Sequence, residues 1–389
     1  MDAGGARDKM AAMDRTAEDR FAAEDRFPAP QVLRLCRQAI AARRLDLGGL
    51  RVLTEAGVGY HCMAPVVAAL AGATEVYAVS RDSAQAARKD AETQTWSLAE
   101  AAGVLRRLQL VSTRLQAPLD TIDIVTDLPG VRPVDESILR TLSDTAVVTL
   151  MRGVAHWRPA DVDIAGCRRS GIAVAGLDEE AVGLLRYAPL AVIWGLTALG
   201  VEATGGVILV AGSGRAYPYV VRALAQLGAR VLVAAPESAG RIALHGGEKV
   251  GDGLAEPAAL GRLGEADALV LAPDLPGDRL LGPGTPLEAH AVAAEAPHLA
   301  VVCGGADIEA RALAEAGLRV WPSPHGGHSA AVEELLPRPV VESLVAGLKV
   351  GEVMARARRG GSSPVAAEQA AAAEAHAELL PKDIAAPRR

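Results

Sequence analysis

Short β-branched, apolar runs alternate regularly with longer stretches of helical periodicity along most of the chain. Such alternation is typical of strands joined by helices in a parallel sheet. The pattern therefore predicts two series of strands. The first series is Arg51–Thr54, Glu75–Ser80, Leu108–Val111, Ile122–Thr126, Ala146–Leu150 and Ile172–Ala175, and the second is Val207–Ala211, Arg230–Ala234, Ala268–Leu271, Ala300–Val302 and Arg319–Trp321.

The stretches between these runs predict the helices that connect the strands. A long apolar helix, from about Glu180 to Leu199, separates the two series. Because parallel strands need right-handed crossovers, each series predicts its own doubly wound sheet. The expected fold class is α/β, with two doubly wound, parallel-sheet, Rossmann-like domains and a cleft between them. The other helices are expected at Ala64–Gly72, Ser83–Ala102, Asp135–Leu142, Pro159–Ser170, Pro218–Leu227 and about Ala330–Arg358.

The length of 389 residues suits two domains, each able to bury a core. We expect a substrate domain at residues 29–185 and a nucleotide-binding domain at 186–328. The helix at 329–358 is long enough to return to the first domain. Residues 1–28 are charged and non-periodic, so we expect a mobile arm, and residues 359–389 are rich in Ala and Glu, so we expect a mobile tail that can form a loose helix.

The amino-acid composition argues against some classes of binding partner. Half of the residues are hydrophobic but only 3% are aromatic, so the cores must consist of Ala, Val, Leu and Ile. With 40 Lys and Arg against 47 Asp and Glu, the net charge of −7 argues against a nucleic-acid partner. The longest apolar run, Leu190–Val201, is too short to cross a bilayer, so no membrane partner is expected.

The cysteines occur singly, at Cys36, Cys62, Cys167 and Cys303. This spacing contains no Cys-x-x-Cys pair, which argues against zinc and disulfides. We therefore expect buried thiols in a reducing compartment, and hence a cytoplasmic protein.

The sharpest local motif is the Gly-x-Gly turn Gly212–Gly214, which joins the strand Val207–Ala211 to a helix. Glycine is needed in such a turn because the backbone must approach a pyrophosphate, whose charge the next helix N-terminus stabilises. Tyr217 replaces the third glycine of the full dinucleotide fingerprint. The turn that we expect to bind a nucleotide consists of Gly212, Ser213, Gly214, Arg215, Ala216 and Tyr217.

The residues at the end of the next strand bear on whether NAD or NADP is the expected cofactor. Ala235 stands where an acidic residue would hold an adenosine ribose, and Glu237 follows two residues later. Without that carboxylate both NAD and NADP are open, with Arg215 or Arg241 as partners of a 2′-phosphate. The alternative is a tight turn that binds nothing.

A second glycine turn follows the first strand, where Glu55 precedes Gly57 and Gly59. Together with Ser80 at the end of the second strand, and with the segment Ile122–Gly130, it resembles the adenosyl site of class I methyltransferases. This resemblance implies S-adenosylmethionine as an alternative ligand. Both signals are short and common among Rossmann-like folds.

An ordered set of motifs between residues 141 and 355 is more specific. The set consists of Thr141–Gly153, Arg158–Ile164, Gly171–Val174, Ala181–Val182, the long crossover helix, the Gly212–Gly214 turn and Ser323–Gly327. It resembles the D-isomer-specific 2-hydroxyacid dehydrogenases. The resemblance implies hydride transfer between a nicotinamide and a 2-oxo or 2-hydroxy acid, a homodimer, and His325 as the proton carrier.

Two further roles of that family have no counterpart at the matching positions. The segment Ala300–Asp307 lacks the arginine that anchors the substrate carboxylate, and the segment before Trp321 lacks the glutamate motif. Arg152 follows a strand end and is a candidate anchor, although a surface ion pair with Asp161 or Asp163 is an equal alternative.

His61 and His156 also follow strand ends and are further catalytic candidates, while capping or solvated histidines are the alternative. His325 and His328 have no acidic or cysteine partner at ligand spacing, so no metal is expected. The leading hypothesis is an NAD(P)-dependent oxidoreductase with a remodelled active site, acting on a small metabolite. The alternatives are an S-adenosylmethionine-dependent transferase and a non-catalytic nucleotide-binding partner protein.

Overall fold

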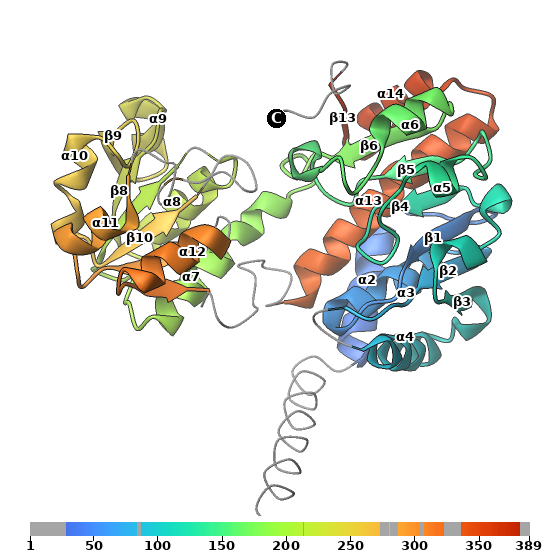
Figure 1. Ribbon diagram of the computed structural model, residues 1–389, viewed down its shortest axis with the longest axis horizontal. Helices are drawn as coiled ribbons and strands as arrows, with labels where there is room; N and C mark the ends of the chain where they lie inside the picture. Colours follow the sequence, from blue (N-terminus) through green and yellow to red (C-terminus); the bar gives the residue numbers. More distant parts are fainter. Residues whose placement is uncertain are drawn as a thin grey trace, which may run out of the picture. The chain divides into compact units, whose positions relative to one another are not determined.

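The computed structural model describes residues 29–83, 87–212, 214–272, 280, 287–303, 307–322 and 336–381. The chain divides into two compact units (Figure 1). Unit 1 combines the chain up to Asp178 with the chain from Pro337 onward, and unit 2 is the continuous stretch Glu179–Leu336. Unit 2 is thus inserted between two parts of unit 1.

Unit 1 contains a seven-stranded sheet in the order β13-β6-β5-β4-β1-β2-β3. Neighbouring strands are parallel except β13, which pairs antiparallel with β6. Val52, Ile124, Val147 and other strand residues are fully buried, as expected of strands covered on both faces. The strands are β1 (Arg51–Glu55), β2 (Glu75–Val79), β3 (Leu108–Val111), β4 (Ile124–Thr126), β5 (Val147–Thr149), β6 (Ala173–Leu177) and β13 (Ala377–Leu379).

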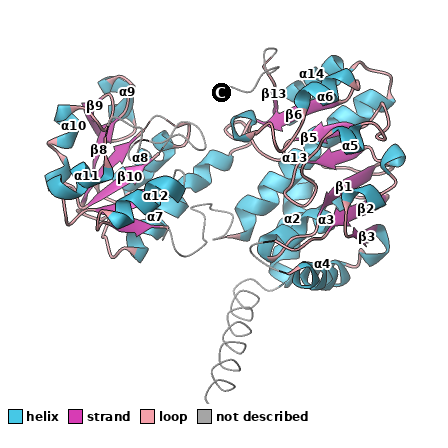
Figure 2. Cartoon of the chain, viewed as in Figure 1, coloured by secondary structure: helices cyan, strands magenta, loops and turns pink. Residues whose placement is uncertain are grey.

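Helices cover both faces of this sheet (Figure 2). On one face α13 crosses β4, β5 and β6 and packs against α2 and α3. On the other face, Ile138 of α5 and Ile164 of α6 share a core with strand residues such as Leu53. The α-helices are α2 (Ala29–Arg43), α3 (Met63–Leu70), α4 (Arg88–Ala102), α5 (Glu136–Leu139), α6 (Ile164–Arg169), α13 (Pro337–Arg359) and α14 (Pro364–Ala375), and the 3₁₀ helices are η1 (Gly59–Cys62), η2 (Leu105–Arg107), η3 (Arg114–Gln116), η4 (Leu119–Thr121) and η5 (Val154–His156).

The C-terminal segment differs from the mobile tail that was predicted. Ser363 caps α14 by accepting a hydrogen bond from the Ala366 amide, and α14 packs against α13 and β6. Small alanines, at positions 367, 371 and 375, form its buried face. β13 then adds to the edge of the sheet. A helix is therefore present in this segment, but it packs on the sheet instead of being loose, because small alanine side chains allow close helix packing despite their weak hydrophobic signal.

Unit 2 contains a six-stranded parallel sheet in the order β12-β11-β10-β7-β8-β9. Separate core clusters cover its two faces, one around Leu209 and Leu232 and the other around Val210 and Val233. The strands are β7 (Val207–Ala211), β8 (Arg230–Ala234), β9 (Gly247–Gly251), β10 (Ala268–Leu271), β11 (Ala300–Cys303) and β12 (Arg319–Trp321). The helices are η6 (Leu184–Tyr187), α7 (Ala188–Ala198), α8 (Tyr217–Gln226), α9 (Ala239–Leu244), α10 (Pro257–Leu260), η7 (Leu263–Glu265), α11 (Ala289–Glu295) and α12 (Asp307–Glu315).

The apolar helix at the start of unit 2 is shorter than the predicted Glu180–Leu199. Gly183 has a φ of +79°, and a 3₁₀ turn precedes α7, which therefore begins at Ala188. α7 packs on α8, β11 and β12. Gly195 allows this close packing, since a Cβ atom there would lie 2.6 Å from Cε3 of Trp321.

The predicted fold class, α/β with two doubly wound parallel sheets, is confirmed (Figure 2). All four cysteines are buried thiols, as predicted, and none of them forms a disulfide. None of the described helices has the length and hydrophobicity that a membrane span requires. The arm at residues 1–28 lies outside the described residues.

Candidate functional site

The strand order of each sheet indicates where a ligand would be expected to bind. In each sheet the chain adds two strands on one side of the first strand and then crosses to the other side. Ligands of open α/β sheets bind outside the carboxyl ends of the strands at this switch point. The switch points lie between β1 and β4 in unit 1 and between β7 and β10 in unit 2.

The glycine turn predicted to bind a nucleotide lies at the switch point of unit 2. Gly212 follows β7 with a φ of +116°, and its amide donates to the Ala234 carbonyl at 3.1 Å. A Cβ atom on Gly212 would lie 1.9 Å from the Ala272 carbonyl oxygen, so only glycine fits there. The Gly214 amide also points to this oxygen, at 3.4 Å. Ser213 lies outside the described residues.

The helix after the turn offers a donor to an anion. Ala216 is the N-cap residue of the ten-residue helix α8, and its amide has no acceptor among the described residues. Such amides, together with the helix dipole, bind phosphates. Arg215, the other candidate partner of a phosphate, forms an exposed ion pair with Glu180 at 3.4 Å.

Tyr217 fills the space that the third glycine would leave. Its side chain is buried in the core around Val220, Val233 and Ala235. Burial, followed by the negative charge of nearby Glu237, raises the pKa of Tyr217 to about 12, while Arg241 opposes the shift. The phenol is therefore neutral at physiological pH and lies close to the Glu237 carboxylate.

Glu237 provides a carboxylate two residues after Ala235, the position where an acidic residue would hold an adenosine ribose. Its atom Oε2 is buried and has no hydrogen-bond partner among the described residues. Its backbone carbonyl accepts a hydrogen bond from Nζ of Lys249 at 2.8 Å, which fixes this segment after β8. Although the Tyr217 phenol already forms a hydrogen bond with this carboxylate, the buried Oε2 atom can accept one from a sugar hydroxyl, so the residues present fit the adenosine ribose of a dinucleotide. Ala235 offers only its buried methyl group, and its amide donates to Gly251.

At the switch point of unit 1, the Glu55 carboxylate is already hydrogen-bonded within the chain. Its side chain is 7% exposed, and Oε2 accepts a hydrogen bond of 2.7 Å from the Gly130 amide in the loop after β4. Burial raises the pKa of Glu55, while the Gly130 amide, His61, Arg132 and Arg81 oppose the shift. A carboxyl group of raised pKa beside a histidine is an arrangement suited to proton transfer.

His61 lies directly over Glu55. Nδ1 of His61 is 3.7 Å from Oε1 of Glu55, and the His61 side chain is 47% exposed. A Cβ atom on Gly57 would lie 2.5 Å from Cβ of His61, so the glycine is needed to seat the histidine. Gly59, with a φ of +58°, donates its amide to Gln94 of α4 at 2.7 Å.

The same edge of the unit 1 sheet holds a chain of ion pairs. Asp127 is buried after β4, and burial raises its pKa against the opposing charge of Arg132. Arg132 pairs with Asp127 at 3.1 Å and with Asp161 at 3.0 Å. Asp161 also pairs with Arg158 at 2.8 Å. These residues fix the loops beyond β4 and β5.

The remaining sequence candidates of unit 1 lie in the loop after β5. Arg152 accepts a hydrogen bond from the Leu177 amide through its carbonyl, and His156 ends the 3₁₀ helix η5. Asp163, a suggested partner of Arg152, pairs with Arg169 at 3.4 Å. The carboxylate of Glu378, on β13, accepts a hydrogen bond from the Val154 amide at 2.8 Å. The C-terminal strand therefore helps to hold this loop.

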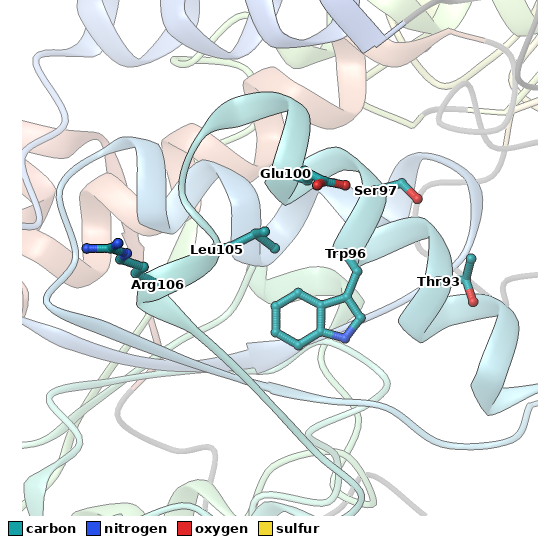
Figure 3. A pocket seen from close by; sticks show the side chains of 6 residues that line it. All are labelled: Thr93, Trp96, Ser97, Glu100, Leu105 and Arg106. Atoms are coloured by element: carbon teal, nitrogen blue, oxygen red, sulfur yellow. The ribbon is translucent and has the colours of Figure 1, made fainter.

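Two further regions were considered as sites. His325 and the motif Ser323–Gly327 lie outside the described residues, so their predicted roles stay predictions. A depression of about 590 Å³ lies on α4 and η2, lined by side chains that include Trp96 and Arg106 (Figure 3). Because η2 directly precedes β3, this depression lies on the amino-terminal side of β3 and not beyond the carboxyl ends of the strands. Within the described part of the chain, no group of histidine, cysteine and acidic side chains is arranged to hold a metal ion.

Comparisons with known proteins agree with this architecture. No protein-family model and no curated protein matches the chain. Among solved structures, a dipicolinate synthase subunit from Bacillus halodurans matches with a TM-score of 0.54 at 16% identity, covering 77% of this chain and 96% of that one. A dipicolinate synthase chain from Bacillus subtilis matches with a TM-score of 0.54 at 14% identity, covering 82% and 100%.

A D-lactate dehydrogenase from Escherichia coli also matches, with a TM-score of 0.45 at 13% identity, covering 81% of this chain and 98% of that one. The two dipicolinate synthase chains show the fold alone, and it is the two-domain architecture expected from the resemblance to D-isomer-specific 2-hydroxyacid dehydrogenases. The sequence of this chain has diverged far from the sequences of these proteins, since the identities are 16%, 14% and 13%.

Sequence reasoning missed Arg81. This residue follows β2, and its guanidinium donates to the carbonyls of Pro129 and Arg132 in the loop after β4. The available signal was its position directly after the predicted strand Glu75–Ser80, at the carboxyl edge of the sheet.

Proposed function

We propose that the chain is an NAD(P)-dependent oxidoreductase that acts on a small metabolite. The observation that carries the proposal is the pair of unsatisfied groups at the switch point of unit 2. The Ala216 amide at the start of α8 suits a phosphate, and the buried Oε2 atom of Glu237 suits a ribose hydroxyl.

The cofactor would supply the hydride, and the chain would bind and orient it. The turn from Gly212 to Tyr217 would hold the pyrophosphate against the start of α8. Glu237 would accept a hydrogen bond from the adenosine ribose, which favours NAD over NADP because a 2′-phosphate would meet this carboxylate. The hydrogen bond from the Tyr217 phenol would keep the Glu237 carboxylate in place.

Substrate roles remain assigned by position and by resemblance. His61, His156 and His325 are the candidates for proton transfer, and Arg152 is a candidate for orienting a substrate carboxylate. Single substitutions of each histidine by glutamine would separate these candidates. The resemblance also suggests a homodimer, which light scattering of the purified protein would test.

Calorimetric titration with NAD, NADH, NADP and NADPH is the direct test of the cofactor. We expect NAD and NADH to bind, and Glu237→Gln to weaken NADH binding by about tenfold or more, the effect of one hydrogen bond to a charged group. The matched control is Glu295→Gln, at the exposed end of α11 in the same unit, which should bind as the wild type does. Failure of all four dinucleotides to bind would overturn the proposal.

The same titration should include S-adenosylmethionine. In unit 1 the groups expected to hold it are already engaged, since Glu55 accepts from Gly130, Gly59 donates to Gln94 and the Ser80 hydroxyl donates to Glu92. Binding of S-adenosylmethionine instead of a dinucleotide would favour a transferase. Dinucleotide binding without turnover of any acid tested would favour a non-catalytic partner protein.

A further inference from the structure

The depression on α4 and η2 results from a reversal of the chain at the end of α4. Gly103 follows the helix with a φ of +74°, a conformation that favours glycine. The Val104 amide then donates to the Ala99 carbonyl at 3.0 Å, and η2 packs back against α4. Residues of both helices line a hollow of about 590 Å³, which lies wholly within unit 1 (Figure 3).

One side of α4 forms most of this hollow. Thr93, Trp96, Ser97 and Glu100 are spaced by three and four residues, so they lie on the same side of the helix. All four side chains are exposed, while the opposite side of α4, which includes Leu98, is buried. The exposed side therefore contributes little to the packing of α4, and its side chains are available to a ligand.

The middle of the hollow is apolar. The Trp96 side chain is 38% exposed, and Figure 3 shows the flat face of its indole ring open beside Leu105. Nε1 of Trp96 donates no hydrogen bond to any of the described residues. An open indole face next to an aliphatic side chain suits an aromatic ring, which stacks on the indole and covers the apolar surface.

Two charges of opposite sign border this apolar surface. Glu100 lies on α4, and Arg106 lies on η2. Both side chains are exposed, and neither forms an ion pair or a side-chain hydrogen bond with another residue in the described part of the chain. A carboxylate accepts hydrogen bonds from an ammonium group, and a guanidinium donates to a carboxylate. Both charges can therefore be paired by one ligand that carries one group of each kind.

The two charges also decide against simpler aromatic ligands. An aromatic acid would pair with Arg106 but would be repelled by Glu100. An aromatic amine would pair with Glu100 but would be repelled by Arg106. A zwitterion gains from both side chains, and an α-amino acid carries its ammonium and carboxylate groups on the same carbon, close to its side chain.

We propose that this hollow binds a free aromatic α-amino acid, with its ring on Trp96, its ammonium group at Glu100 and its carboxylate at Arg106. Every group that this site needs belongs to unit 1. The site does not depend on the dinucleotide proposed for unit 2, so either proposal can fail while the other holds.

Binding is measured by NMR on the full chain labelled with nitrogen-15. The chain has four tryptophans, so the indole N–H signal of Trp96 is identified by its loss in Trp96→Leu. This signal should shift during titration with L-phenylalanine. The titration extends to millimolar concentrations, because a small ligand in an open site binds weakly. Trp96→Leu, followed through the ligand signals, should bind L-phenylalanine about threefold to tenfold more weakly, the range for an aromatic contact.

Three analogues of L-phenylalanine each lack one of the recognised groups. Hydrocinnamate lacks the ammonium group, phenethylamine lacks the carboxylate, and alanine lacks the ring. Each analogue should bind about threefold to tenfold more weakly than L-phenylalanine, because it loses one exposed ion pair or one ring contact. The loss from each missing charge should shrink at high salt, which screens exposed pairs.

The charge variants should lose only the contribution of the matching group. Glu100→Gln should weaken binding of L-phenylalanine and phenethylamine by about threefold to fivefold and should not weaken binding of hydrocinnamate. Arg106→Gln should weaken binding of L-phenylalanine and hydrocinnamate to the same extent and should not weaken binding of phenethylamine. The matched controls are Glu136→Gln and Arg140→Gln on α5, whose side chains are 69% and 75% exposed and which should bind as the wild type does.

The outcomes separate this site from its alternatives. Matching losses in the two charge variants, with unchanged urea midpoints of unfolding, would support the proposal. No shift of the Trp96 signal with L-phenylalanine, or a shift of another indole signal alone, would overturn it. Equal affinities for L-phenylalanine and either singly charged analogue would also overturn it, as would binding that ignores both Glu100→Gln and Arg106→Gln.

Discussion

The buried carboxylate of Asp123 joins helix α13 to the sheet of unit 1 through Arg359, and the two partners should respond unequally to mutation. Asp123, which is 5% exposed, accepts two hydrogen bonds of 2.8 Å from Arg359 on α13 and one of 2.8 Å from the Arg51 amide. The Arg359 side chain is 43% exposed. Removing the arginine leaves a buried charge without its cation, whereas removing the aspartate leaves a cation that water can solvate.

These exposures give the expected magnitudes. Arg359→Ala should lower the free energy of unfolding of unit 1 by about 3 kcal/mol, as for other buried charges deprived of a partner. Asp123→Ala should lower it by about 2 kcal/mol, mainly because the Arg51 amide loses its acceptor. The double variant should fall well short of the sum of the two single variants.

The assay is urea unfolding followed by hydrogen exchange in peptides from β1 and α13, because a chain of two units need not unfold in one step. Arg169→Ala is the matched control, since its pair with Asp163 is exposed on both sides and should contribute no more than about 1 kcal/mol. If Asp123→Ala proves more destabilising than Arg359→Ala, the argument from unequal burial is refuted.

Three further outcomes are expected. Gly195→Ala should destabilise unit 2 by about 1–3 kcal/mol in urea unfolding, because the added methyl group meets an indole ring at 2.6 Å, whereas Gly240→Ala in the open on α9 should be neutral or slightly stabilising. Burial raises the pKa of Glu55 above 4.5, so the wild type loses stability as the pH rises through the folded-state pKa. Glu55→Gln should abolish that loss, and an equal pH dependence in both proteins between about pH 4 and 8 would contradict it. Burial raises the pKa of Cys36 and Cys167 to about 12, so neither should react with iodoacetamide in the native protein at about pH 8, and rapid labelling would show that these thiols are accessible.

The sequence predicted the interior strands of both sheets but missed two strands at sheet edges. The missed strands are β9, Gly247–Gly251, and β13, Ala377–Leu379. Edge strands are paired on one side only, so they need no continuous apolar run, and β9 has glycine at both ends. Their pairing depends on β8 and β6, which no local pattern reveals.

The candidate site was predicted in part for the same reason. Glu55, His61 and the Gly212 turn were identified because residues at strand ends lie at the carboxyl edge of a parallel sheet. The contact of Glu55 with the Gly130 amide depends on β1 and β4 being neighbours, although more than sixty residues separate them in the chain. The hydrogen bonds from Arg81 to the loop after β4 depend on the same strand order.

The insertion of unit 2 into unit 1 has a consequence for biosynthesis. Unit 2 is continuous, so all of it has been translated before residue 337 is made, and it can fold while the ribosome is still working. Unit 1 must wait, because α13 covers β4, β5 and β6 and is made near the end of translation. Until then the apolar face beneath α13 stays exposed in the nascent chain, so a ribosome that stalls after unit 2 should present a substrate for chaperones.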